Sequence, residues 1–241
     1  MNDRQGNILE YKTRANSVDD GRKFLAEVTA QGSQAVCSEA SMFYRLVKRC
    51  IDILLSAAAL ILLAPVFLIT AIVVFISSPG PIFFKQQRAG KLGKAFTMYK
   101  FRTMHVNAQA ARDEIEDLNC QTGPVFKAPN DPRLIRFGKF LRRSSLDELP
   151  QFLNVLKGDM SIVGPRPLWI KEAQNISGAA KYRTLVKPGL TCIWQISGRS
   201  SMSYEQWILL DLFYINNRSL VLDFLIVMQT IPAVLTGYGA F

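Results

Sequence analysis

The feature that most constrains the fold is an uncharged, apolar run of 24 residues from Ile53 to Ile76. As one straight helix this run would be roughly 36 Å long, whereas the hydrocarbon core of a bilayer is about 30 Å thick. Basic residues flank the run on both sides: Arg45, Lys48 and Arg49 before it, and Lys85, Arg88, Lys91 and Lys94 after it. Because Lys and Arg collect on the cytoplasmic side of membrane segments, both flanks are predicted to lie on the same side of a membrane.

Pro65 lies near the middle of the run, with 12 residues before it and 11 after it. Proline removes a backbone hydrogen bond and clashes with the preceding turn, so it kinks a helix. Each half would be roughly 17 Å long, which reaches about the middle of the bilayer. Hydropathy alone favours a single spanning helix, but the proline and the flanking charges favour a re-entrant helix over residues 42–78 that is broken at Pro65.

The chain differs in character on the two sides of this run. Residues 1–41 are polar and contain no apolar segment of the kind found in a signal peptide, so they predict a disordered tail. Residues 79–241 are predicted to form one domain of the α+β class, mainly helical. Two strands with Gly90 and Gly93 between them, at 82–88 and 95–103, predict a β-hairpin. Helices are expected at 107–118, 134–143, 147–156, 204–215 and 220–235, the last packed on the domain or lying in a membrane interface.

Charge narrows the partners that this domain can have. The formal net charge is +10, and residues 1–41 contribute about −1, so the rest of the chain carries about +11. Such an excess suits nucleic acid, nucleotide phosphates or an anionic membrane surface. The four cysteines are scattered and His105 is the single histidine, which argues against a zinc site and for reduced cytosolic thiols. A structural role is expected for His105.

An adjacent pair of carboxylates, Asp147 and Glu148, is the first candidate for chemistry. Two serines precede the pair and are expected to cap a helix that starts there. Such pairs most often only complement a helix dipole. Here four basic residues come just before the pair: Arg136, Lys139, Arg142 and Arg143. These cations would neutralise an anionic diphosphate and let a carboxylate approach it, and a shared divalent ion would help in the same way.

Two further basic features suit the binding of phosphate. Lys100 and Arg102 are expected on one face of the second strand, where they would form either a phosphate clamp or an exposed basic strand. Arg166 stands between Pro165 and Pro167, which limit the backbone around it. That constraint would preorganise a guanidinium for two-point phosphate binding, and the alternative is a structural turn with an incidental arginine.

Several longer motifs follow one another after the basic flank and the broken apolar run. They are KFRTM (100–104), LRRSSLDELPQ (141–151), GDMSIVGPRP (158–167), KPGLT (187–191) and WQISGR (194–199). Together, over about residues 42–241, they resemble the monotopic phosphoglycosyl transferases, the bacterial sugar transferase family that starts exopolysaccharide and glycan assembly. The C-terminal part is most similar to the short hexose-1-phosphate transferases of exopolysaccharide pathways.

The resemblance implies a covalent mechanism. Asp147 would attack the β-phosphate of a UDP-sugar, release UMP and hold the phosphosugar until undecaprenyl phosphate attacks it. Glu148 would handle a metal or a proton, Mg²⁺ is the implied cofactor, and both carboxylates are its expected ligands. The residues expected to bind substrate phosphates are Lys100, Arg102, Arg143, Arg166 and Arg199. The expected sugar is a plain hexose, glucose or galactose.

The resemblance also implies a location. The protein is expected in the bacterial inner membrane, with membrane lipid as a partner. Residues 79–241 are expected to form a catalytic domain on the cytoplasmic face. Many family members carry Ser-Pro at the helix break, where the hydroxyl can satisfy a freed carbonyl, but this chain has Ala64 before Pro65. The kink is expected to persist without that hydroxyl, and a spanning topology stays open.

Two other functional classes compete with the enzyme. A non-enzymatic basic membrane adaptor would explain the apolar run and the charge, but not an acidic pair beside Arg142 and Arg143. A nucleic-acid-binding protein would need no apolar run, and nucleic acid is not expected as a partner. The sequence does not determine the oligomeric state, so a homo-oligomer stays open.

Overall fold

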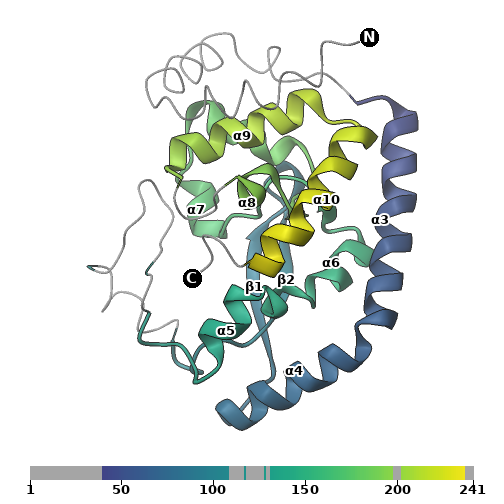
Figure 1. Ribbon diagram of the computed structural model, residues 1–241. Coiled ribbons are helices and arrows are strands. Elements are labelled where there is room, and N and C mark those ends of the chain that lie inside the picture. Colours follow the sequence, from purple (N-terminus) through teal and green to yellow (C-terminus); the bar gives the residue numbers. More distant parts are fainter. Residues whose placement is uncertain (1–39, 109–116, 118–127, 129–130, 198–201, 237–241) are drawn as a thin grey trace.

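The structure is a computed structural model that describes residues 40–108, 117, 128, 131–197 and 202–236 (Figure 1). Within these residues the chain is mainly helical, with an antiparallel and a parallel sheet of two strands each. This confirms the mainly helical α+β class. The predicted tail falls almost entirely outside the described residues, as does most of the helix predicted at 107–118.

The apolar run forms two helices, α3 (Met42–Leu62) and α4 (Ala64–Ser77), that meet at an angle of 63°. Pro65 lies in the first turn of α4, where its missing N–H has no helical partner to lose. The predicted break is therefore confirmed, and it falls at Leu63, just before the proline. No single helix among the described residues is long and apolar enough to cross a membrane, whereas the bent pair together meets both criteria.

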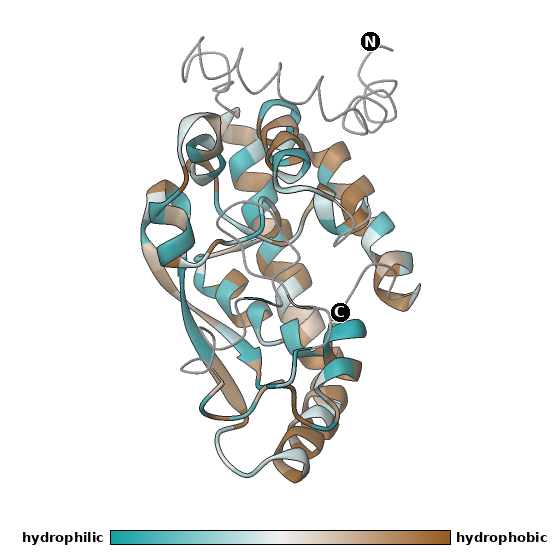
Figure 2. Ribbon diagram, turned by 90° about the vertical axis from the view of Figure 1, so that its left-hand side faces the viewer, coloured by the Kyte–Doolittle hydropathy of each residue, from teal (hydrophilic) through white to brown (hydrophobic). Residues whose placement is uncertain are grey.

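The two helices are attached to the rest of the chain in different ways. On α3, Arg49 donates hydrogen bonds to the carbonyls of Val155 and Leu156, at 2.6 and 2.8 Å, and Asp52 accepts one from the Ile162 N–H at 3.0 Å. On α4 the contacts are apolar, and Figure 2 shows hydrophobic residues along most of its length. Large side chains on α4 stay exposed: Leu68, Ile69, Ile72, Phe75 and Ile76.

The predicted β-hairpin is present. Strands β1 (Phe83–Ala89) and β2 (Ala95–Phe101) pair in antiparallel register, and the short 3₁₀ turn η2 (Lys91–Gly93) joins them. Helix α6 (Gln151–Lys157) lies beside β2, where the Asn154 side chain accepts a hydrogen bond from the Tyr99 N–H at 3.0 Å and donates one to the Thr97 carbonyl at 2.7 Å. The Asn154 side chain thus forms the kind of paired hydrogen bonds that a neighbouring strand would form with β2, and these bonds attach α6 to β2.

The helices expected at 134–143 and 147–156 are shorter than predicted. Helix α5 covers Gly138–Arg143, because Leu134 instead makes a β-bridge to Met104. The second helix is divided into the 3₁₀ turn η4 (Leu146–Glu148) and α6, with Pro150 preceding α6. This division separates the acidic pair from the regular helix.

A second pair of strands, β3 (Ser161–Val163) and β4 (Gly189–Thr191), runs parallel. Their ends approach so closely that a Cβ on Gly189 would lie less than 3.0 Å from the backbone nitrogen of Gly164. Along the chain α7 (Ile170–Gln174) and η5 (Gly178–Leu185) connect the two strands, and α8 (Ile193–Ile196) follows β4. Strand β4 also contacts the loop after Val163, because the Gly189 N–H donates to the Pro165 carbonyl at 2.9 Å.

Two longer helices, α9 (Tyr204–Asn217) and α10 (Leu220–Thr236), confirm the predicted late helices. Residues 207–215 of α9 are all buried, and α9 contributes to the main core together with α6, β2 and β3. Helix α10 packs on this core through Leu222 and Ile226. A smaller core of Val74, Phe101, Ile135 and Leu141 joins α4 to β2 and α5.

Candidate active site

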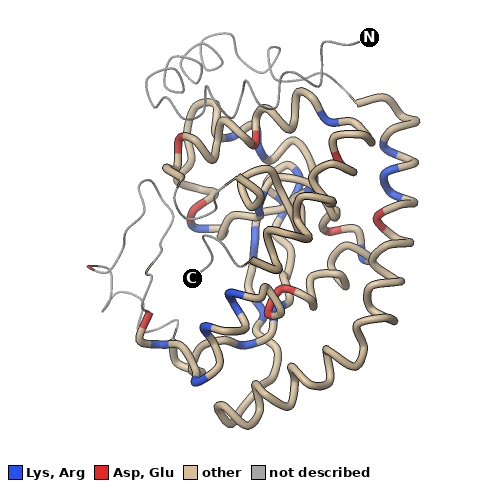
Figure 3. Tube along the Cα trace, in the orientation of Figure 1, with Lys and Arg blue, Asp and Glu red and all other residues tan. Residues whose placement is uncertain are grey.

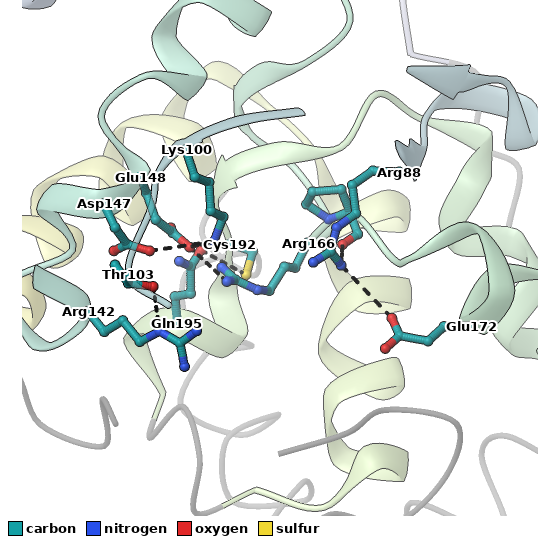
Figure 4. A network of polar contacts seen from close by, with 11 residues as sticks. Arg88, Lys100, Thr103, Arg142, Asp147, Glu148, Arg166, Glu172, Cys192 and Gln195 are labelled. Carbon is teal, nitrogen blue, oxygen red and sulfur yellow. Dashed lines mark hydrogen bonds and ion pairs between the residues drawn. The ribbon is translucent and has the colours of Figure 1, made fainter. Parts of the chain in front are cut away.

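The acidic pair lies in a partly buried cluster of charges built from three separate segments. Lys100 comes from β2, Asp147 and Glu148 come from η4, and Arg166 comes from the loop after β3 (Figure 4). In Figure 3 the red part of η4 lies close to the blue residues of α5 along the trace. The structure therefore brings together four of the residues that the sequence predicted for the site.

Glu148 is held by two cations. Its Oε1 accepts a hydrogen bond from Lys100 Nζ at 2.7 Å and another from Arg166 Nη2 at 2.8 Å. Burial by itself would raise the pKa of Glu148, but Arg166 and Lys100 hold this pKa well below its usual range. Glu148 is therefore ionised at neutral pH and serves as the anchor for both cations.

Asp147 is held much more weakly. Among the described residues its carboxylate accepts no hydrogen bond, and the nearest cation, Lys100 Nζ, is 3.9 Å from Oδ2. Burial raises the pKa of Asp147 to about 6, an effect that Lys100 opposes and the neighbouring Glu148 reinforces. At pH 7 the group is mostly ionised, and its oxygens are not committed to a donor. Asp147 is therefore the carboxylate of the pair that can act as a nucleophile.

The backbone before the pair is strained. Ser145 has φ 57°, in the left-handed region that non-glycine residues seldom adopt. The expectation that the serines cap a helix at the acidic pair is wrong. The Ser144 hydroxyl instead donates back to the carbonyls of Phe140 and Leu141, at 2.9 and 3.2 Å, and so closes the end of α5. The reversal at Ser145 then turns η4, with its two carboxylates, toward Lys100.

The loop of Arg166 is fixed through its carbonyl groups. Pro165 and Pro167 have no N–H, so their backbone can form hydrogen bonds only through the carbonyl groups. Four consecutive carbonyls accept hydrogen bonds: Pro165 from Gly189 N–H at 2.9 Å, Arg166 from Arg183 Nη2 at 2.9 Å, Pro167 from Arg88 Nη1 at 3.1 Å, and Leu168 from Ala89 N–H at 2.9 Å. The predicted constraint by the two prolines is thus completed by donors from β4, η5 and β1.

Two of the predicted phosphate-binding residues, Arg102 and Arg143, do not join this cluster. Strand β2 ends at Phe101, so its alternation does not continue to Arg102, and the predicted clamp with Lys100 is not formed. The Arg102 guanidinium instead donates to the carbonyls of Ser78 and Pro79 at the end of α4. Arg143 is exposed at the end of α5, and Arg199 lies outside the described residues.

Arg142 is the basic residue of α5 that faces the acidic pair. Its Nε donates a hydrogen bond to Thr103 Oγ1 at 3.1 Å (Figure 4). Burial lowers the pKa of Arg142, and Asp147 is the first of the charges that oppose this shift. The sequence pointed to the neighbouring Arg143, because a run of two arginines does not reveal which one a short helix turns inward.

Cys192 and Gln195 also lie in this group of polar residues, and the sequence did not assign them individually (Figure 4). The Cys192 thiol donates to Gln195 Oε1 at 3.3 Å, and burial raises the pKa of Cys192 to about 12. This thiol is therefore neutral at physiological pH and is no nucleophile. The Arg166 guanidinium lies 5.7 Å from the ring centroid of Trp194.

The two carboxylates fit a magnesium ion. Among the described residues no group of three or more His, Cys, Asp or Glu side chains is gathered at one place. Mg²⁺ needs fewer protein ligands than that, because it commonly binds one or two carboxylates together with substrate phosphates and water. Glu148 uses Oε1 for both cations, which leaves its Oε2 and the Asp147 carboxylate for a metal.

Comparison with known proteins connects this site to a family. Residues 43–237 match the sequence model of the family described as "Bacterial sugar transferase". The chain is 41% identical over 198 residues to "Exopolysaccharide production protein ExoY" of Sinorhizobium fredii, which covers 80% of this chain and 88% of that protein. It is 45% identical over 162 residues to "Galactosyl transferase CpsE" of Streptococcus agalactiae, with 67% of this chain covered. It is 39% identical over 201 residues to "Undecaprenyl-phosphate galactose phosphotransferase" of Salmonella typhimurium, with 82% covered.

The relatives differ in length. The alignments cover 36% of the Streptococcus protein and 42% of the Salmonella protein, so the chain spans less than half of these two relatives. It matches most of the ExoY protein.

Proposed function

The chain belongs to the bacterial sugar transferase family, as its motifs predicted, and we propose that it transfers a sugar 1-phosphate from a UDP-sugar to undecaprenyl phosphate. The observation that carries this proposal is the asymmetry of the acidic pair. Glu148 is neutralised by Lys100 and Arg166, whereas Asp147 is buried beside them without a hydrogen bond among the described residues. One carboxylate thus fixes the cations and the other is free to form a bond.

In the first step an Asp147 oxygen attacks the β-phosphorus of the UDP-sugar. The bond from that phosphorus to the oxygen bridging the two phosphates breaks, and UMP leaves with the electron pair. The sugar phosphate is then held on Asp147 as an acyl phosphate. Lys100, Arg166 and Arg142 offset the charge of the diphosphate, without which a carboxylate could not approach it.

In the second step a phosphate oxygen of undecaprenyl phosphate attacks the same phosphorus. The bond to Asp147 breaks, the carboxylate is regenerated, and undecaprenyl diphosphate-sugar is released. The two steps form a ping-pong route in which one carboxylate serves twice. This would be the first membrane step in assembling an exopolysaccharide or another glycan.

Asp147 and Glu148 are the proposed ligands of Mg²⁺. When bound, the ion would supply positive charge to the diphosphate of the donor. Lys100 and Arg166 both contact Oε1 of Glu148, so its Oε2 would be the oxygen that holds the ion.

We also propose that α3 and α4 form a re-entrant membrane segment in the bacterial inner membrane. Arg49 and Asp52 attach α3 to the domain, and Arg102 attaches the end of α4 to the same domain. A spanning segment would place its two ends on opposite sides of a core about 30 Å thick. Because α3 and the end of α4 are both attached to one domain, we infer that the segment enters and leaves the membrane at the same face. This is the cytoplasmic face, where UDP-sugars are made. Cysteines introduced at Arg45 and Lys94 should both be labelled from that face, whereas a spanning segment would protect one of them.

The proposed donor carries glucose or galactose. The names of the Streptococcus and Salmonella relatives refer to galactosyl or galactose transfer, which supports a plain hexose. A panel of UDP-sugars offered one at a time identifies the donor. The preferred sugar should release UMP faster than its epimer and its acetamido analogue.

The test separates the two steps. The full chain in detergent with Mg²⁺ is mixed with each UDP-sugar, first without undecaprenyl phosphate and then with it. The preferred donor should give one UMP per chain and a mass increase of one sugar phosphate on Asp147, and lipid should then start turnover. Asp147→Asn should lower UMP release at least about 1000-fold. Glu205→Gln, which removes a carboxylate on α9, is the matched control and should keep full activity.

Two results would contradict the proposal. If folded, membrane-bound protein released no UMP from any UDP-sugar, the donor class would be wrong. If UMP appeared only when lipid and donor were both present, with no adduct on Asp147, transfer would be direct and the covalent route would fail.

A further inference from the structure

Arg183 is a second arginine beneath the loop of Arg166. It comes from η5, and it is buried together with Asp211 of α9. One nitrogen, Arg183 Nη2, contacts Asp211 Oδ2 at 2.6 Å and donates to the Arg166 carbonyl at 2.9 Å. Arg183 therefore connects its ion pair with Asp211 to the backbone of Arg166, the residue that contacts Glu148.

The same two arginines are also linked through aromatic rings. The Arg183 guanidinium lies 4.6 Å from the ring centroid of Trp207. Trp207 stacks on Trp194 with ring centroids 5.0 Å apart and an angle of 23° between the planes. The Arg166 guanidinium lies 5.7 Å from the centroid of Trp194. Arg166 is thus supported at its carbonyl and at its guanidinium by one connected group of side chains.

A long side chain such as arginine needs this support if it is to present a fixed charge. Its guanidinium otherwise samples several rotamers, and ordering it costs conformational entropy. The Arg166 side chain is 28% exposed, so its surroundings do not fix it on all sides. The prolines fix the backbone near Arg166, but they do not fix its side chain.

We propose that Arg183 is a positioning residue that places Arg166 for the donor diphosphate, acting through the Arg166 carbonyl and the Trp207–Trp194 stack. This inference rests on the function proposed above. A buried ion pair contributes little to stability by itself, because desolvation cancels most of its attraction. The contact of Arg183 with the Arg166 carbonyl gives this pair a role in the site.

A double-mutant cycle tests the inference. The variants are Arg183→Lys, Arg183→Gln, Arg166→Lys and the two combinations, and the measurement is the single-turnover rate of UMP release at several donor concentrations. Arg183→Gln should slow the step at saturating donor about 100-fold, and Arg183→Lys, which keeps the charge opposite Asp211, should recover about tenfold of that loss. When residue 166 is already lysine, Arg183→Gln should cost no more than about threefold. Equal losses in both backgrounds would overturn the inference.

A matched variant separates positioning from loss of stability. Lys48→Met breaks another partly buried ion pair, Lys48–Asp223 at 2.8 Å, which joins α3 to α10 and makes no contact with Arg166. It should lower the unfolding temperature in the same direction as Arg183→Gln. Its effect on the single-turnover rate should stay within about twofold and should add independently to that of Arg166→Lys. A loss as large as that of Arg183→Gln would show that instability alone explains the result.

A structure of a variant provides a readout that does not depend on turnover. In Arg183→Gln, or in Arg183→Lys if the glutamine variant does not fold, Arg166 Nη2 should move out of hydrogen-bond distance from Glu148 Oε1. An unchanged separation of 2.8 Å would overturn the inference whatever the substrate. If the wild type released no UMP while the variant structure showed this displacement, the proposed function would fail and the positioning role would stand.

Discussion

The two walls of the site are built in opposite ways. In the fixed wall, residues 164–168, four consecutive carbonyls accept hydrogen bonds from other segments. In the reactive wall, residues 145–148, the backbone starts from a strained Ser145, and the Asp147 carboxylate accepts no hydrogen bond within the described chain. The fixed wall holds positive charge where substrate charge must be neutralised, and the reactive wall leaves an oxygen free to form a bond. Preorganisation is thus concentrated where it lowers the electrostatic barrier.

Gly189→Ala should break the fixed wall and have the largest effect. A Cβ at this position would lie closer than 3.0 Å to the backbone of Gly164, which cannot move without separating β3 from β4. We expect a loss of stability above about 4 kcal/mol, enough to prevent folding of many domains. Expression and thermal unfolding in detergent measure it.

Gly93→Ala is the matched control for this prediction. Gly93 has φ 74°, but a Cβ there would meet nothing within 4 Å. Only backbone strain remains, about 1 kcal/mol. If both alanine variants unfolded at the same temperature, the close approach of Gly164 and Gly189 would not be what holds the fixed wall.

The two carboxylates should respond oppositely when their charges are removed. Glu148→Gln leaves Lys100 and Arg166 without their shared anion and should cost about 2–4 kcal/mol. Asp147→Asn should stabilise the protein at pH 7 by up to about 3 kcal/mol, because burial disfavours the ionised form of this group. The unfolding temperatures of the two variants, compared with that of Glu205→Gln, test whether their stabilities change in opposite directions. Destabilisation by both would mean that Asp147 is held as firmly as Glu148.

The pH dependence sharpens the same contrast. The pKa of Asp147 is raised to about 6, so the nucleophilic form is lost as the pH falls below that value. The rate of UMP release at low donor concentration should fall about tenfold per pH unit below pH 6. The pKa of Glu148 is shifted in the other direction and should contribute no further loss in this range. A rate that is flat down to pH 4.5 would contradict the raised pKa of Asp147.

Much of the arrangement could be predicted from local sequence. Pro65 predicted the broken helix, the glycines after β1 predicted the hairpin, and the acidic pair and Arg166 were identified as site residues. These features depend on backbone restrictions and charge patterns within a few residues. Family membership was predicted from longer motifs in a fixed order.

What the sequence did not predict depends on tertiary contacts. Strand β2 ends one residue before Arg102, and this turns Arg102 toward α4 instead of the acidic pair. The choice between Arg142 and Arg143 depends on how α5 is rotated on its core. The ion pair of Arg183 with Asp211 joins residues that are distant in sequence, and no local pattern marks it. Such contacts are determined by packing, which a single sequence does not show.

Ser145 provides the smallest test, and it concerns the reactive wall. At φ 57° a serine is strained by about 1 kcal/mol, and glycine would remove this strain. Glycine also raises the entropy of the unfolded chain by a similar amount, so Ser145→Gly should change stability by less than about 0.5 kcal/mol. Ser145→Val should cost about 2 kcal/mol, because a β-branched side chain fits this conformation worst. Thermal unfolding measures the difference in stability, and the single-turnover rate of UMP release shows whether the substitution also alters the reactivity of Asp147. If valine were tolerated as well as glycine, the turn would adjust freely, and the position of the carboxylates would not depend on the strained residue before them.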